Sequence, residues 1–343
     1  MTGHRDTCYS TATTDLHLAH VAPVMDDPEN RIETREDSYD IESWEPRTTT
    51  DRLALRLYRL LTGATRGLTL LLALTFVLAE LVLVGATVAE RPLLGVFSFL
   101  SVIPALLLAF YIWRADPTER EPLPTLVVTF LLGVVFAAFA AIINTVGAFA
   151  LSGLGIGVLA IVPFFFLVVG PVEETVKWLA VRFHAYRTPH FQTAVDGAVY
   201  GAMAGLGFAT IENLTYVVGS VNVNGGVGTS VTVSGVAVTR AIVGPNHVLW
   251  AAISGYYLGL AKIVPANRGP IIVKGIAIPA VLHGFYNSTA GFVTETMASV
   301  VGGDALFWLL VYVLVFAGLV GGYLFQKIRR AREYYEGQIR LGW

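Results

Sequence analysis

Two glutamates and a lysine interrupt an otherwise apolar stretch of the chain. The segment FFFLVVGPVEETVKWLAV, residues 164–181, carries Glu173, Glu174 and Lys177. A charge at the centre of a membrane-spanning helix costs about 2.5–3.5 kcal/mol, and such residues usually face the bundle interior and belong to a functional site. Glu173 and Lys177 share a helical face and can pair, whereas adjacent Glu173 and Glu174 point about 100° apart. We therefore expect one glutamate to meet a substrate and the other to stabilise the structure.

Three further residues of chemically active types lie in the apolar runs that follow: Glu212, His247 and His283. Glutamate and histidine bind zinc or activate a water molecule. Taken singly, each histidine is more simply a core residue bonded to a backbone carbonyl, and Glu174 with Lys177 is as simply a structural ion pair. Carboxylates and imidazoles on four adjacent helices have little reason to be buried unless they meet. The joint pattern predicts a hydrolytic site or a metal site.

The composition is that of a polytopic membrane protein. Of the 343 residues, 55% are hydrophobic and only 14% are charged, whereas soluble domains have about 25% charged residues. Crossing a bilayer takes about 20 apolar residues in a helix, and eight runs are long enough: 67–89, 93–113, 124–151, 154–181, 195–218, 238–263, 270–293 and 304–326. We predict an all-α fold, a polytopic membrane helical bundle of about eight transmembrane helices.

Basic residues alternate between the two sides of this bundle. Arginines and lysines occupy the flank before the first run, every second connection after it, and the C-terminus, whereas the opposite loops offer only Arg91 and Arg240. Loops rich in Lys and Arg stay in the cytoplasm. We therefore expect a multi-pass protein of the cell membrane with both termini cytoplasmic.

The N-terminal segment differs from the rest of the chain. Residues 1–51 contain 12 Asp or Glu against 4 Arg, and few apolar residues. Such a segment cannot build a core. We expect a disordered acidic cytoplasmic tail over 1–51 and a transmembrane helical domain over 52–343, with the chemically interesting part at about 100–290.

Two features of the expected helices decide whether the site can form. The run GAMAGLGF, residues 201–208, has the closely spaced small residues typical of tight helix packing in membranes. Helical rise places Glu173 nearer the cytoplasmic face and Glu212 nearer the outer face, a mismatch of about 10 Å. The two can share a site if the fourth run is kinked at Pro171 or if the fifth helix begins later, near Val199.

Four short motifs carry a resemblance to a known family. EETVK (173–177) matches an EExxK motif, FATIEN (208–213) an FxxxEN motif, and DPTEREP (116–122) a DxxExEP signature. His247 and HGFYN (283–287) stand where that family has its later histidines. With these motifs in order over about 100–290, the chain resembles the PrsW intramembrane proteases, which are similar to the wider CAAX-protease and bacteriocin-processing superfamily.

The resemblance implies hydrolysis of a peptide bond of a membrane-anchored protein within or near the bilayer. In bacteria this activity is linked to membrane-bound anti-sigma factors, so an anti-sigma-factor-like substrate is the expected partner, with no nucleic acid. It implies a Glu/His site with or without zinc, in which Glu173 is the general base. Glu212, His247 and His283 either bind the zinc or position water and stabilise the oxyanion directly.

Two of the remaining polar residues have supporting roles in that scheme. Asn287, one turn from His283, could donate a hydrogen bond to the oxyanion, and Lys177 would neutralise a carboxylate such as Glu174. The alternatives are a proton-coupled transporter, since buried Glu, Lys and His also make proton relays, and an inactive membrane scaffold. Against the transporter, the sequence has no inverted repeat, and the polar residues cluster in one half of the chain.

Overall fold

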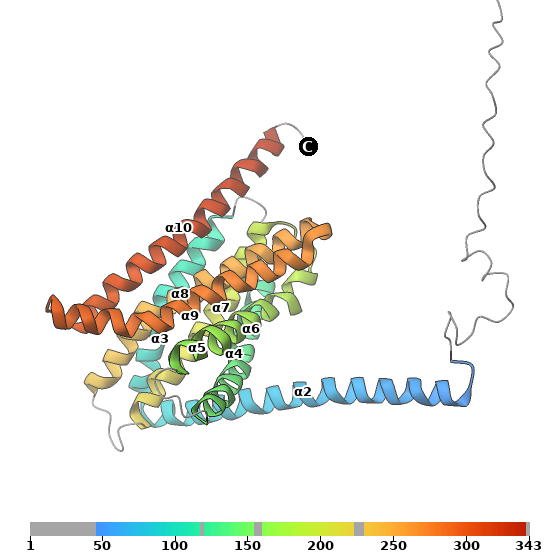
Figure 1. The fold of residues 1–343 in the computed structure, drawn as a ribbon, viewed down its shortest axis with the longest axis horizontal. Helices are drawn as coiled ribbons and strands as arrows, with labels where there is room; N and C mark the ends of the chain where they lie inside the picture. Colours follow the sequence, from blue (N-terminus) through green and yellow to red (C-terminus); the bar gives the residue numbers. More distant parts are fainter. Residues whose placement is uncertain (1–45, 117–119, 154–159, 223–229, 341–343) are drawn as a thin grey trace, which may run out of the picture. The chain divides into compact units, whose positions relative to one another are not determined.

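The computed structural model describes residues 46–116, 120–153, 160–222 and 230–340. The disorder expected for the acidic tail therefore falls mostly on residues 1–45, outside the described part. The described residues form helices and no strand (Figure 1). The main helices are α2 (Thr49–Glu90), α3 (Pro92–Arg114), α4 (Leu123–Ser152), α5 (Ile161–Phe164), α6 (Gly170–Phe183), α7 (Ala194–Asn222), α8 (Ser230–Ile263), α9 (Arg268–Val300) and α10 (Ala305–Arg340).

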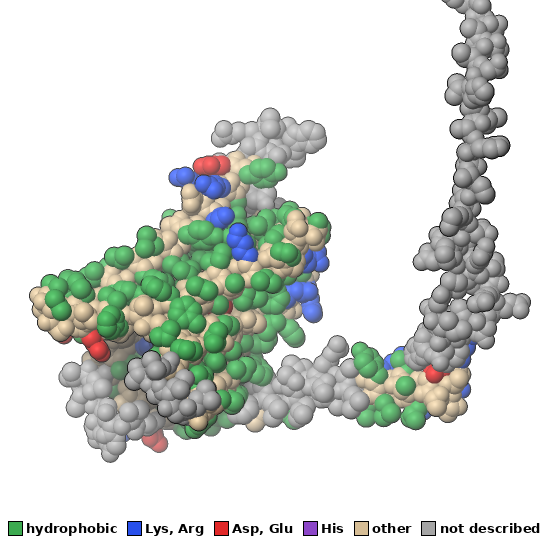
Figure 2. All heavy atoms as spheres, in the orientation of Figure 1, with side chains coloured by type: hydrophobic (Ala, Val, Ile, Leu, Met, Phe, Trp, Pro, Cys, Tyr) green, Lys and Arg blue, Asp and Glu red, His purple; other side chains and the backbone are tan. Residues whose placement is uncertain are grey.

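The bundle has the character of a multi-pass membrane protein, which confirms the predicted fold class. Within the described residues six helices are long and apolar enough to cross a membrane: α3, α4, α7, α8, the segment Pro265–Val300 that contains α9, and α10. They correspond to six of the eight expected runs. Figure 2 shows hydrophobic side chains covering most of the visible face of the bundle. The remaining two runs lie in α2 and in the segment that leads into α6.

The fourth expected run is not one regular helix. Between α5 and α6 the chain forms a π-helical turn, η2 (Phe165–Val169), and Pro171 occupies the first turn of α6. Proline has no backbone N–H to donate into the preceding turn, and π-turns inside helices often occur at functional sites. The interruption thus lies directly before the EETVK motif, close to the expected kink. The fifth helix, α7, begins at Ala194 and not near Val199.

Small residues allow α7 to pack closely against its neighbours, as the GAMAGLGF run predicts. A Cβ added at Gly201 would lie 2.2 Å from the carbonyl oxygen of Ala251 on α8, and one at Gly207 would lie 2.1 Å from that of Phe130 on α4. Such close backbone approach is how small residues hold membrane helices together. Helix α7 therefore packs closely against both α4 and α8, and both of these helices carry residues of the site described below.

Gly205→Ala is expected to disrupt the site through this contact. The new Cβ would lie 2.4 Å from the carbonyl oxygen of His247 and 2.8 Å from the Cβ of Ala251, so α8 must move away. Overpacking of this kind costs about 1–3 kcal/mol, and we expect a lower melting temperature together with lost activity. Gly219→Ala is the matched control on the same helix, because its Cβ meets no atom within 4 Å. Equal melting temperatures for the two variants would contradict the packing described here.

Two described residues of the DPTEREP segment, Asp116 and Glu121, lie beside the start of α7. Glu121 is buried and accepts a hydrogen bond from the Tyr200 hydroxyl, and its carboxylate lies within 4.8 Å of those of Asp116 and Asp196. Asp196 forms a capping box with Thr193: Thr193 N donates to Asp196 Oδ2 at 2.8 Å, and Asp196 N donates to Thr193 Oγ1 at 3.1 Å. The motif thus joins the α3–α4 connection to the N-terminus of α7.

Glu121→Gln is expected to stabilise the protein at alkaline pH. Burial raises the pKa of Glu121 from 4.5 to about 8, so the folded protein keeps a proton that the unfolded chain loses between those values. Stability of the wild type therefore falls as the pH rises from about 4.5 to 8. Glutamine has the same shape and nothing to ionise, so the variant's advantage in melting temperature should grow from pH 5 to pH 8. An advantage that is independent of pH would contradict this assignment.

Candidate active site

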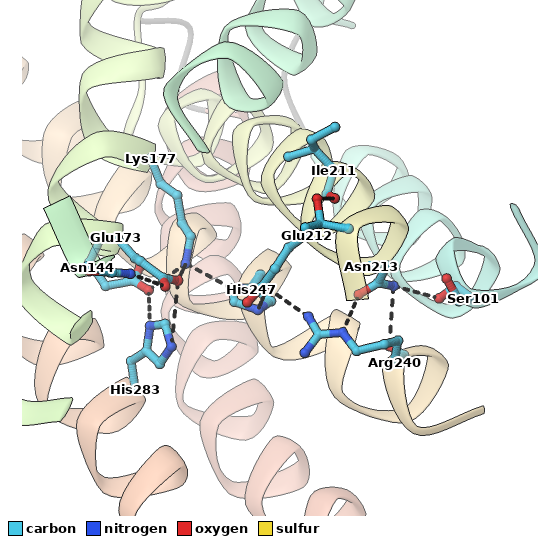
Figure 3. A network of polar contacts seen from close by, with 12 residues as sticks. Ser101, Asn144, Glu173, Lys177, Ile211, Glu212, Asn213, Arg240, His247 and His283 are labelled. Atoms are coloured by element: carbon cyan, nitrogen blue, oxygen red, sulfur yellow. Dashed lines mark hydrogen bonds and ion pairs between the residues drawn. The ribbon is translucent and has the colours of Figure 1, made fainter. Parts of the chain in front are cut away.

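One network of polar contacts crosses the interior of the bundle (Figure 3). Its centre is Lys177 of α6, whose ammonium lies 2.7 Å from Glu174 Oε1 and 2.9 Å from His247 Nδ1. On one side of Lys177 Figure 3 shows the group around His283, and on the other side the group around Glu212. Four successive helices, α6, α7, α8 and α9, thereby place their ionisable side chains in one connected cluster.

The two adjacent glutamates have different surroundings. Glu174 is fully buried, and its Oε1 accepts from Lys177 and lies 2.9 Å from His283 Nδ1. Glu173 lies in the wall of a cavity. Its Oε1 accepts a hydrogen bond from Asn144 of α4 at 3.0 Å, whereas its buried Oε2 has no hydrogen-bond partner. Glu174 Oε2 likewise has no hydrogen-bond partner, but of the pair only Glu173 lines the cavity.

The hydrogen-bond partners assign the proton positions of both histidines. An ammonium can only donate, so His247 Nδ1 accepts from Lys177, and the proton on Nε2 is donated to Glu212 Oε2, 2.7 Å away. His283 Nδ1 donates to Glu174 Oε1, which leaves its Nε2 as an acceptor. That nitrogen lies 3.7 Å from Glu173 Oε2, which has no hydrogen-bond partner. Two hydrogen-bond acceptors, one on α6 and one on α9, thus face each other.

Aromatic rings enclose the cationic and imidazole groups. Trp250 stacks on His283 with 4.3 Å between ring centroids, and the Lys177 ammonium lies 4.3 Å from the centroid of the Phe208 ring. A cation over an aromatic face is stabilised by the ring quadrupole. This contact gives Phe208, the first residue of the FATIEN segment, a physical role in holding Lys177.

The cavity beside Glu173 has a volume of about 330 Å³. Asn144, Glu173, Glu212 and Asn287 line it, together with the apolar side chains of α4, η2 and α7. Glu212 and Glu173 therefore share one space, and the expected mismatch of about 10 Å in helical rise does not separate them. The other residues predicted from the sequence do not line the cavity: Glu174, Lys177, His247 and His283.

Asn144 and Arg240 belong to the network and were not predicted from the sequence. Asn144 carries no charge and lies in a long apolar run, so nothing in the pattern distinguished it. Arg240 was assigned to an outer loop, which is wrong, because it lies inside α8, with Nη2 2.7 Å from Glu212 Oε2. Its spacing of seven residues from His247, two helical turns along the same face, was the signal that could have placed it.

The residues fit a metal ion. Ligand atoms of Glu173, His247 and His283 all lie within 4.8 Å of one another, and one carboxylate with two histidines is a donor set of catalytic zinc sites. Glu173 Oε2, which has no hydrogen-bond partner, is the oxygen that such an ion would satisfy, and His247 Nδ1 would bind the ion in place of its hydrogen bond from Lys177. Glu212, expected from the sequence to be a ligand, contacts the far nitrogen of His247, where a carboxylate orients a metal-binding imidazole.

Comparisons with known proteins agree with this site and fold. Residues 121–320 match the family model described as PrsW family intramembrane metalloprotease. The chain is 34% identical over 194 residues to Protease PrsW of Geobacillus kaustophilus, covering 56% of this chain and 79% of that protein. It is 28% identical over 251 residues to Protease PrsW of Bacillus subtilis, covering 69% and 96% of the two chains. No solved structure matches.

A multi-pass helical bundle with a buried Glu/His cluster and this family match defines the chain as a membrane-embedded peptidase. The chain belongs to the PrsW family of intramembrane metalloproteases. It hydrolyses a peptide bond of a membrane-anchored substrate within the bilayer. Neither alternative function considered for the sequence, a proton-coupled transporter or an inactive scaffold, finds support among the relatives.

Proposed function

We propose that Glu173 is the general base of this intramembrane protease. The observation that carries the proposal is the place of Glu173 in the cavity wall, with a buried Oε2 that has no hydrogen-bond partner and lies 3.7 Å from the acceptor nitrogen of His283. A water between these two atoms would have a proton within hydrogen-bond reach of the carboxylate. Asn144 fixes the carboxylate by donating to its other oxygen.

The neighbouring residues have separate roles in the hydrolysis we propose. The water oxygen attacks the scissile carbonyl carbon while Glu173 takes its proton. The C–N bond then breaks, and Glu173 returns that proton to the leaving amine. Asn287, in the same cavity, would donate to the oxyanion between these steps. Lys177 and Glu174 hold His247 and His283 in the tautomers described above.

We propose zinc as the metal of the site, held by His247, His283 and one carboxylate. When bound, the ion would polarise the attacking water and the scissile carbonyl. If Glu212 is the carboxylate ligand, as expected from the sequence, Glu173 remains available as the base. Glu173 is the carboxylate that lies with both histidines, so the metal contents of Glu173→Gln and Glu212→Gln decide between the two arrangements.

The substrate we propose is an anti-sigma-factor-like protein anchored in the cell membrane. In an intact α-helix each peptide carbonyl accepts a hydrogen bond within the helix, so it is not free to meet a water activated by Glu173. We therefore expect the cleaved segment to lie extended in the cavity beside Glu173. We expect the cut within a locally unwound part of the substrate's membrane segment or directly next to it.

A reconstitution experiment tests the proposed function. The purified full chain is placed in liposomes with a panel of single-span reporters, and mass spectrometry locates any cut. Wild type and Glu295→Gln, which changes an exposed acid, should cleave and bind metal. The double variant His247→Ala/His283→Ala should do neither, because it removes two of about three protein ligands. Equal cleavage by the double variant would contradict the site assignment.

We also propose that both termini lie in the cytoplasm. The boundary between the acidic tail and the transmembrane domain, near residue 51, is part of the same proposal. In a Cys8→Ser background, which removes the chain's one cysteine, a cysteine at Ala266 should react with membrane-impermeant reagent from the cytoplasmic side. A cysteine at Asn224 should react from the outer side. Position 266 is expected on the cytoplasmic side because it lies beside the basic residues near Arg268, and loops rich in Lys and Arg stay in the cytoplasm. The opposite labelling pattern would overturn the orientation.

A further inference from the structure

Arg240 is a charged residue inside a membrane-spanning helix, and it makes several contacts within the network. Its side chain is 11% exposed, and its Nη2 lies 2.7 Å from Glu212 Oε2. Its Nε donates to Asn213 Oδ1 at 2.9 Å, and its guanidinium carbon lies 4.4 Å from the centroid of the Tyr216 ring. A guanidinium at this depth is costly unless it is paired. The three contacts lie along one side of α7.

The contact with Glu212 connects Arg240 to the active site. A single oxygen, Glu212 Oε2, accepts from both Arg240 Nη2 and His247 Nε2. The guanidinium thus holds this carboxylate oxygen against the imidazole, which has its proton on Nε2 and its lone pair on Nδ1. In Figure 3 the series Arg240, Glu212, His247, Lys177 runs from α8 to α6.

We infer that Arg240 is a positioning residue, which holds Glu212 so that His247 adopts one tautomer and one ring orientation at the active site. The inference rests on the proposed function. Arg240 does not line the cavity, so its effect on a substrate is carried through Glu212 and His247. Partners that orient a functional histidine typically contribute about 10- to 100-fold to activity or metal affinity.

The geometry requires an arginine and not merely a positive charge. The planar guanidinium reaches Glu212 with Nη2 and Asn213 with Nε at the same time, whereas an ammonium is a point charge on a flexible stem. Asn213 is itself anchored, because its Nδ2 donates to the carbonyl oxygen of Ser101 on α3 at 3.0 Å. The guanidinium of Arg240 therefore contacts an anchored neighbour. A lysine at position 240 should keep the positive charge but should hold Glu212 in its orientation only in part.

The test combines a spectroscopic readout with cleavage, using the full chain in lipid. Nitrogen-15 NMR of histidine-labelled protein reports the tautomer of His247, whose signal is identified by its loss in His247→Ala. Wild type should show one Nε2–H tautomer. Arg240→Met should show a mixture of tautomers and a kcat about 10- to 100-fold lower with little change in KM, and Arg240→Lys should be intermediate. Arg91→Met, which changes an exposed arginine, is the matched control and should resemble wild type.

Each outcome either supports the inference or overturns it. A folded Arg240→Met with the wild-type His247 spectrum and wild-type kcat overturns it. If Arg240→Met does not fold, the His247 spectrum and the kcat of Arg240→Lys are compared with wild type instead, and wild-type values for both overturn the inference. Whatever the variants do, a wild-type His247 that is an Nδ1–H tautomer or a mixture also overturns the inference. If no reporter is cleaved by wild type, the proposed function fails, whereas the tautomer measurement still tests Arg240.

Discussion

Glu173→Gln is expected to lower the rate of substrate cleavage by about 10²- to 10⁴-fold, the usual contribution of a general base. Glutamine keeps the shape of the side chain and can still accept the hydrogen bond from Asn144, but it cannot take a proton from water. The fold should therefore remain intact, with a melting temperature close to that of wild type. The measurement is single-turnover cleavage of a membrane-anchored reporter in liposomes.

Glu174→Gln provides the comparison within the same motif. Glu174 is fully buried and lies against both Lys177 and His283, so its replacement should lower stability as well as activity. A loss of activity with retained stability in Glu173→Gln, against a loss of both in Glu174→Gln, separates the base from its structural neighbour. A rate within a few-fold of wild type for Glu173→Gln would instead move the base to Glu174 or defeat the hydrolytic mechanism.

Lys177→Met is expected to have the largest effect on stability. The ammonium is fully buried, lies 2.7 Å from the fully buried Glu174 and 3.8 Å from Glu173, and donates to His247. Removing one partner of a buried ion pair leaves an uncompensated charge and costs about 3–5 kcal/mol. We expect a corresponding drop in the free energy of unfolding, measured by denaturant titration in detergent, together with loss of cleavage.

Two further variants test whether the loss of stability in Lys177→Met comes from the buried ion pair. Lys274→Met changes an exposed lysine and should shift the free energy of unfolding by less than about 0.5 kcal/mol. The double variant Lys177→Met/Glu174→Gln removes both charges and should recover part of the lost stability, since replacing both partners avoids the unpaired charge. A Lys177→Met protein as stable as wild type would contradict the buried ion pair described here.

The chemical core of the site could be predicted from residue type and spacing. Charged and imidazole side chains are expensive in apolar helices, so Glu173, Glu212, His247 and His283 stood out, and the structure brings them together. The angle of about 100° between adjacent helical residues also anticipated that the two glutamates would differ. Glu173 lines the cavity, and Glu174 does not.

The remaining features depend on contacts between helices that no local pattern records. Asn144 acquires its role only because α4 packs beside α6, and an asparagine in an apolar run carries too weak a signal. Arg240 was counted among the outer-loop residues although it lies at the start of the expected run 238–263, because an unpaired charge is costly in a membrane; in the structure α7 supplies its partners. The π-turn before Pro171 was missed for a similar reason, since the average hydropathy of a segment does not distinguish one helical hydrogen-bond pattern from another.

The most direct test of the central claim follows the oxygen atom of the attacking water. Wild type and Glu173→Gln, reconstituted in liposomes, are each given the same membrane-anchored reporter in ¹⁸O-water, and the products are weighed by mass spectrometry. The mechanism predicts a wild-type product whose new C-terminal carboxylate carries one ¹⁸O atom, from a cut in or next to the membrane segment, and almost none of this product with Glu173→Gln. An equal yield of the same labelled product from Glu173→Gln would contradict the assignment of Glu173 as the base that activates water.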